Sequence, residues 1–116
     1  RAVLAASAAL SVEAAPQMGK IDCQSHLFSE EFLKILERRT SGPRVYRKRN
    51  DRYVVVGDWH RRILPKHTDL QVKLADMDAA GIAMAALSIN DPGPELFGAE
   101  SVAMARLLND FVASAV

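Results

Sequence analysis

Gly81-Ile82-Ala83-Met84-Ala85-Ala86-Leu87-Ser88 is the stretch that decides the fold class. From Ile82 onward the run is almost continuously apolar and has the length of one strand, which is typical of a strand covered on both faces in a parallel sheet. The preceding segment predicts a helix that begins at a capping-box pair, Thr68 and Gln71, and ends at the C-cap glycine Gly81. A helix followed at once by such a strand indicates βαβ units and an α/β fold.

A second strand is predicted near the start of the chain, over residues 20–28. Polar and apolar side chains alternate there, and successive side chains of a strand point to opposite faces. The polar face carries Asp22, Gln24 and His26. Three side chains with metal-ligand potential on one face of one strand make this segment the first candidate for chemistry.

The segments between and after these strands predict an inserted helix and a hairpin. Ser29 is placed to cap a helix. Residues 44–47 and 53–56 are β-prone runs that predict a hairpin, whereas residues 57–67 are expected to be irregular. An apolar stripe that starts at Met104 predicts a last helix.

Composition excludes several classes of protein. The chain has 116 residues, 49% of them hydrophobic and 25% charged, with a net charge of +1, which indicates a globular protein with no global attraction to nucleic acid or membranes. Its one cysteine, Cys23, excludes an internal disulfide. The hairpin is locally basic and is interpreted first as a solvated edge whose charges prevent strand-to-strand aggregation, with an anion- or partner-binding edge as the alternative. The basic stretch runs from the last turn of the preceding helix into the hairpin and contains Arg38, Arg39, Arg44, Arg47, Lys48, Arg49 and Arg52.

Residues 1–16 resemble the back half of a bacterial secretion signal. Arg1 precedes a short apolar run, and a small-residue stretch, Val12-Glu13-Ala14-Ala15-Pro16, follows it like a cleavage site. The run is too short to span a bilayer, which takes about 20 apolar residues. This interpretation predicts an exported protein, periplasmic or extracellular; the alternative is an Ala-rich helix of the fold and a cytoplasmic protein.

Three ordered motifs together resemble the amidohydrolase-related family, in the branch of aminocarboxymuconate-semialdehyde decarboxylase. Residues 21–26 are similar to that family's first-strand Asp-x-His-x-His pattern, residues 76–88 to its "MD-x-x-G-[IV]…LS" stretch, and residues 107–113 to its following helix. The resemblance covers about residues 19–116. It implies that residues 17–116 are the N-terminal part of a (β/α)8 TIM barrel, namely the first two strand-helix units with an insertion at about 29–67.

The resemblance also implies a metal site. His26 matches the second histidine of the motif and is expected to bind a divalent metal, in first place zinc, while Asp22 is expected to support it. Gln24 stands where the family has its first histidine, and its neutral amide oxygen is a poorer ligand, so metal binding is expected to be weakened or lost. The family's remaining ligands and its acid–base histidine would lie beyond Val116, so no catalytic residue is expected within the chain itself.

The function implied is that of a metal-dependent hydrolase or carboxy-lyase acting on a small molecule, incomplete without the downstream barrel. The first alternative is a non-catalytic barrel relative that binds a ligand or partner without turnover. The second is a self-contained small α/β binding domain that uses the basic hairpin. No nucleic acid partner and no membrane span are expected, and the full-length protein is a possible homodimer.

Several further residues are left open by the sequence. Arg52, Arg61 and Arg62 are equal candidates to hold a substrate carboxylate, and Asn90 with Asp91 is either part of a site or a turn before Pro92. The surface is the first expectation for His60 and His67. Trp59 is expected either at the mouth of the site or packed under the insertion.

Overall fold

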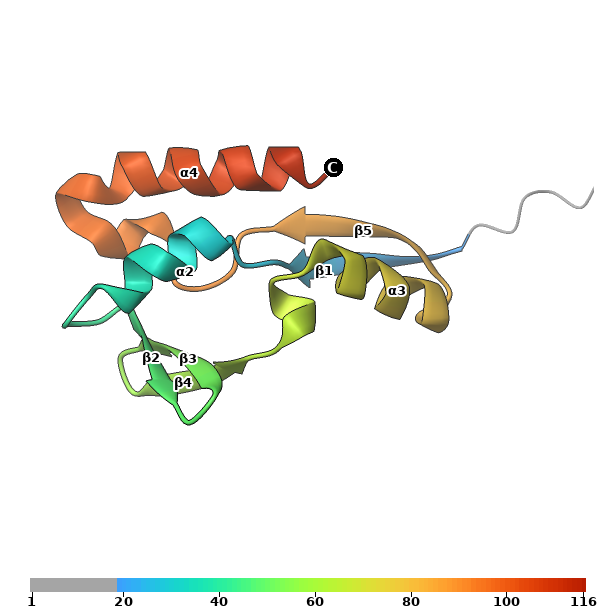
Figure 1. Cartoon of the computed structure of the whole chain (residues 1–116). Helices are drawn as coiled ribbons and strands as arrows, with labels where there is room; N and C mark the ends of the chain where they lie inside the picture. The colour runs from blue at the N-terminus through green and yellow to red at the C-terminus, as the bar shows by residue number, and fades with distance from the viewer. Residues whose placement is uncertain (1–18) are drawn as a thin grey trace, which may run out of the picture.

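The computed structural model describes residues 19–116, which contain two separate sheets and three α-helices (Figure 1). The predicted leader, residues 1–16, and the export that it implies lie outside the described residues. The elements in chain order are β1 (Lys20–His26), α2 (Glu30–Glu37), β2 (Arg44–Lys48), β3 (Asp51–Val56), β4 (Trp59–Ile63), η1 (Pro65–His67), α3 (Leu70–Ala80), β5 (Ile82–Ser88), η2 (Pro94–Glu100) and α4 (Ser101–Ser114).

The first sheet is a parallel pair of β1 and β5. The alternating run over residues 20–28 and the apolar run from Ile82 predicted these two strands. The register runs from Lys20 opposite Ile82 to His26 opposite Ser88, so both strands end side by side. The pairing is irregular between Asp22 and Ser25. Such an irregularity re-aims the side chains that follow it.

The second sheet is antiparallel, in the order β2-β3-β4, and confirms the predicted hairpin. The expectation of an irregular segment over residues 57–67 is wrong, because Trp59–Ile63 pairs with β3 along its length. A tight turn at Gly57, whose φ of 56° is in the left-handed region, returns the chain onto β3. The sequence Trp-His-Arg-Arg-Ile lacks the apolar alternation that marks a strand.

Helix ends follow the predicted capping chemistry in two cases out of three. The Ser29 hydroxyl accepts a hydrogen bond from the Phe32 N–H at 3.3 Å and begins α2. Gly81 ends α3 with a left-handed φ of 67°. The predicted Thr68–Gln71 capping box is wrong, because the Asp69 carboxylate caps α3 by accepting from the N–H groups of residues 71 and 72.

The hydrophobic core lies between α2, the antiparallel sheet, η2 and α4. Its buried members are Phe28, Phe32, Leu33, Leu36, Val45, Val54, Ile63, Phe97 and Leu108. In contrast, no residue of α3 or β5 is buried, and Ile21 and Met84 on the parallel pair are 52% and 63% exposed. The Ile82–Ser88 strand, whose composition suits a strand covered on both faces, is therefore not covered by the rest of the described residues.

The predicted fold class needs a corresponding correction. The described residues do not form the first two strand-helix units of a (β/α)8 TIM barrel; they form a small α/β domain with one parallel pair and one separate antiparallel sheet. The physical reason is that the predicted insertion, about residues 29–67, contributes most of the core residues. Strand β5 of the parallel pair contributes none.

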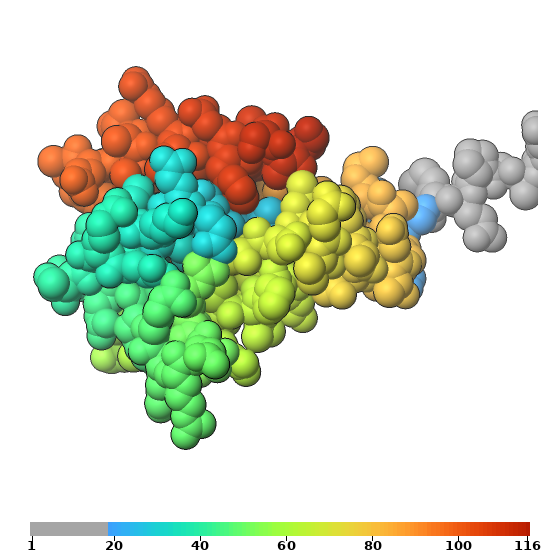
Figure 2. Space-filling model, in the orientation of Figure 1, coloured from blue at the N-terminus to red at the C-terminus, as the bar shows by residue number. Residues whose placement is uncertain are grey.

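The basic hairpin projects from the body as a solvated edge (Figure 2). Its cations are partly neutralised by carboxylates: Arg52 pairs with Glu30 at 2.7 Å, and Arg47 pairs with Glu37 at 2.9 Å. Arg49 at the turn is exposed. Within residues 19–116, no helix is both long and apolar enough to cross a bilayer.

Candidate functional site

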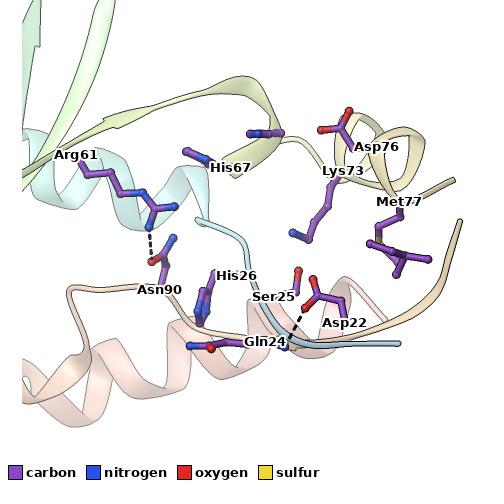
Figure 3. Close-up of a pocket in the computed structure, with 12 residues that line it drawn as sticks. Asp22, Gln24, Ser25, His26, Arg61, His67, Lys73, Asp76, Met77 and Asn90 are labelled. Carbon is purple, nitrogen blue, oxygen red and sulfur yellow. Dashed lines mark hydrogen bonds between the residues drawn. The ribbon is translucent and has the colours of Figure 1, made fainter. Parts of the chain in front are cut away.

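A basin of about 320 Å³ opens beside β1, between that strand, β4, η1 and α3 (Figure 3). Small-molecule sites in proteins start at about this size. Its polar and charged lining comprises Asp22, Gln24, Ser25, His26, Arg61, Lys66, His67, Lys73, Asp76 and Asn90, and Met77 and Ile82 complete it.

The predicted polar face of β1 lines this basin. Asp22, Gln24 and His26 all contribute to it, so the structure places the predicted metal-ligand pair, Gln24 and His26, on one site. Asp22 accepts a hydrogen bond from the backbone N–H of Gln24 at 3.0 Å. That contact lies at the irregular part of the strand, and the expected role of Asp22 in supporting a metal ligand stays a prediction.

The tautomer of His26 follows from its hydrogen bonds. Its Nδ1 lies 3.0 Å from the carbonyl oxygen of Ile89 and 3.0 Å from the hydroxyl of Ser88. A carbonyl oxygen can only accept, so Nδ1 carries the proton and donates it. Nε2 is then unprotonated in the neutral ring and has a free lone pair. A histidine that donates from one ring nitrogen to a backbone carbonyl, and so keeps the other nitrogen free, has the usual arrangement of a metal ligand or a base.

The donor set does not complete a metal centre. Among residues 19–116 there is no group of three His, Cys, Asp or Glu side chains arranged to hold a metal ion. A catalytic zinc site takes three protein ligands and leaves one position for water or substrate. His26 offers one good ligand atom and Gln24 one neutral oxygen, so the described residues alone do not fit a zinc ion.

Cationic side chains dominate the opposite wall. Arg61 on β4 donates from Nη1 to Oδ1 of the buried Asn90 at 3.4 Å, and Lys66 and Lys73 reach the basin from η1 and α3. Among the described residues no ion pair joins either lysine to a carboxylate. The wall therefore has positive charge available to an anion that enters the basin.

The pKa of His67 is affected by burial and by these positive charges. Burial lowers its pKa below the usual value of 6.5, and the nearby charges of Arg61, Lys66 and Lys73 lower it further. Its Nδ1 accepts a hydrogen bond from the backbone N–H of Leu64 at 3.1 Å. His67 is consequently neutral near pH 7, with the proton on Nε2, and has the opposite tautomer to His26.

The structure separates the candidates that the sequence left equal. Arg61 lies in the basin, whereas Arg52 is held by Glu30 and Arg62 by Asp51. Asn90 belongs to the site. Two further candidates are exposed and do not line the basin: Asp91, and Trp59, which is 44% exposed.

Several basin residues were missed or misplaced by sequence reasoning. His60 is exposed as expected, but His67 is half-buried in the site. The polar loop around His67 gave no sign of this, because η1 is formed by a Pro-Lys-His turn of only three residues. Ser25 and Lys73 were also missed: Ser25 lies between two residues of the polar face, and nothing in the sequence distinguishes Lys73 from a solvated helix lysine.

Comparisons with known proteins find likeness at the level of structure and none at the level of sequence. No protein-family model matches the chain, and neither does any curated protein. The chain is similar to the crystal structure of Metarhizium anisopliae IDCase in apo form, with a TM-score of 0.75 and 18% sequence identity. The similarity covers 85% of this chain and 32% of that chain, so the chain spans about a third of the length of the solved structure. At this identity the likeness shows the fold alone.

These findings correct the resemblance to the amidohydrolase-related family. The three motifs quoted for it are short, no family model supports them, and the structural likeness is to IDCase. Short polar and apolar patterns of this kind arise from strand alternation and helix capping in many α/β proteins, which is why an ordered set of them was not sufficient.

Proposed function

We propose that this chain forms part of the active site of an enzyme that acts on a small anionic molecule, by hydrolysis or decarboxylation. The observation that carries the proposal is the composition of the basin. It brings together a histidine with a free Nε2, His26, and a wall of positive charge from Arg61, Lys66 and Lys73. The likeness to IDCase supports the fold that holds this basin, and the activity itself is inferred from the basin.

The basin supplies the two functions that such reactions need. Positive side chains hold an anionic substrate and stabilise the negative charge that develops on oxygen or carbon in the transition state. An imidazole with a fixed tautomer and a free nitrogen accepts a proton or returns it. His67 adds a neutral Nε2–H donor on the same wall.

A divalent metal ion is a further part of the proposal, and two atoms of the predicted pair would bind it. They are Nε2 of His26 and Oε1 of Gln24. Because Gln24 contributes only a neutral oxygen, zinc at this pair is expected to bind weakly.

The test is a substrate panel with matched histidine variants. The purified protein is incubated, with and without added zinc, with small carboxylic acids, esters and amides, and release of carbon dioxide or acid is followed. His26→Gln should lose roughly 100-fold or more in rate, because it removes the proton-transfer group. His60→Gln is the control, since His60 is exposed and outside the basin. Equal rates in the two variants would contradict the proposal.

Ligand binding without turnover is a second candidate. It is favoured by Gln24, which stands at a position suited to a metal ligand and offers only a neutral oxygen. The variant Gln24→His separates the candidates. A gain in zinc affinity with new activity would show that the native site binds without turnover, whereas activity already present in the native protein would exclude this candidate.

A further inference from the structure

Ser25 carries a buried hydroxyl for which the described structure offers no partner. The residue is 3% exposed, and its Oγ is the one buried side-chain oxygen or nitrogen among the described residues that lacks a hydrogen bond. A buried hydroxyl with no partner costs free energy, and such groups are uncommon in folded proteins. Ser25 also lines the basin, which places this unused donor beside a ligand site.

The surroundings of Ser25 favour an anionic group. In Figure 3 the Ser25 side chain points to the part of the basin where the Lys73 side chain extends from α3, next to Asp22. The Lys73 ammonium group has no ion pair with a carboxylate among the described residues. Lysine is a flexible side chain, so its charge can follow an anion that enters from solvent and reach the hydroxyl with it.

The carboxylates near this end do not remove the preference. Asp22 and Asp76 both line the basin and keep their charge, but the three cations Arg61, Lys66 and Lys73 outnumber them. Arg61 and Lys66 add positive charge from the other walls, and after burial, which is the larger cause, their charges also lower the pKa of His67.

We propose that Ser25 and Lys73 form a carboxylate subsite in this basin, in which the Ser25 hydroxyl and the Lys73 ammonium group both donate to one carboxylate of a small-molecule ligand. The subsite lies toward α3, whereas Arg61 with Asn90 lies toward β4, so the basin binds a ligand with polar groups at both ends. The inference rests on the proposed function only in regarding this ligand as the substrate, since binding itself requires no turnover.

The test measures binding of malonate to the purified protein by NMR, at constant ionic strength maintained with sodium chloride. Malonate should shift the backbone resonances of Ser25 and Lys73 in a saturable manner. Ser25→Ala and Lys73→Met should each weaken malonate binding about tenfold or more, the size expected for a hydrogen bond to a charged group. Lys48→Met is the matched control, because Lys48 is an exposed lysine of the hairpin outside the basin, and it should leave binding unchanged.

A stability measurement separates binding from folding. Because Ser25 Oγ has no partner to lose, Ser25→Ala should melt at the same temperature as the native protein or higher. A lower melting temperature, or unchanged malonate binding in both basin variants, would overturn the subsite. If malonate binds as expected but His26→Gln does not affect any turnover, the subsite stands and the proposed enzyme function fails.

Discussion

The uneven distribution of the core predicts that two truncations of large apolar side chains will have very different costs. Phe32 on α2 is fully buried, and its ring packs against that of Phe97 with centroids 5.6 Å apart. Phe32→Ala should therefore cost about 3–5 kcal/mol in the free energy of unfolding. Met84 on β5 is 63% exposed, and Met84→Ala should cost no more than about 0.5 kcal/mol.

The first of these costs is a large share of the total. A domain of this size is stable by roughly 5–15 kcal/mol, at about 0.05–0.15 kcal/mol per residue. Phe32→Ala should therefore shift the urea midpoint strongly. Fluorescence of Trp59, the single tryptophan, provides one signal and far-ultraviolet circular dichroism a second.

Hydrogen exchange of the native protein tests the same asymmetry without mutation. Amides of α2 and β3 should exchange only through global unfolding, since both elements contribute to the core. Amides of α3 should exchange through local openings that cost less free energy than global unfolding, because none of the residues of α3 is buried. Equal costs for Phe32→Ala and Met84→Ala, or equal protection of α2 and α3, would refute the argument that the core excludes α3 and β5.

Three further predictions concern single side chains. The folded protein binds a proton at His67 less readily than the unfolded chain does. The free energy of unfolding should therefore have its full value above about pH 6.5 and fall as the pH drops below it. Denaturation at several pH values should show this fall, and His67→Gln should abolish it. A double-mutant cycle on Arg52→Ala and Glu30→Ala should give a coupling of roughly 0.5–1 kcal/mol, reduced by salt, since the pair is bidentate but Glu30 is half exposed; zero coupling at low salt would contradict it. Gln24→His should raise zinc affinity, measured by competition with a chromophoric chelator, and an unchanged affinity would show that positions 24 and 26 do not share an ion.

Much of the secondary structure was predictable because local chemistry determined it. The alternation in residues 20–28 and the apolar run from Ile82 predicted β1 and β5, and Ser29 and Gly81 marked helix ends through their capping geometry. Strand β4, Trp59–Ile63, was missed because its pairing with β3 is a tertiary effect that the composition of β4 does not reveal.

The tertiary arrangement was less predictable. An apolar run indicates which residues tend to be buried, but not what covers them. Residues 82–88 have the composition of a strand covered on both faces, yet in the described chain none of them is buried. The barrel prediction followed from that composition and from short motifs, and the observed sheets replace it.

The candidate site was predictable only along one strand. The period of two placed Asp22, Gln24 and His26 on one face, and all three line the basin. The other walls come from segments about 35 to 65 residues away in the sequence, so the contributions of Arg61, His67 and Asn90 required the fold. The order among Arg52, Arg61 and Arg62 was likewise decided by their partners, which spacing does not reveal.

The tautomers of the two basin histidines test the central claim most directly. A long-range proton–nitrogen NMR correlation at a pH where imidazoles are neutral resolves which ring nitrogen carries the proton, and single substitutions identify His26, His60 and His67. The hydrogen bonds predict protonated Nδ1 with free Nε2 at His26, and protonated Nε2 at His67. A His26 protonated on Nε2 would remove the free nitrogen from the basin, and the proposed site would lose its reactive group.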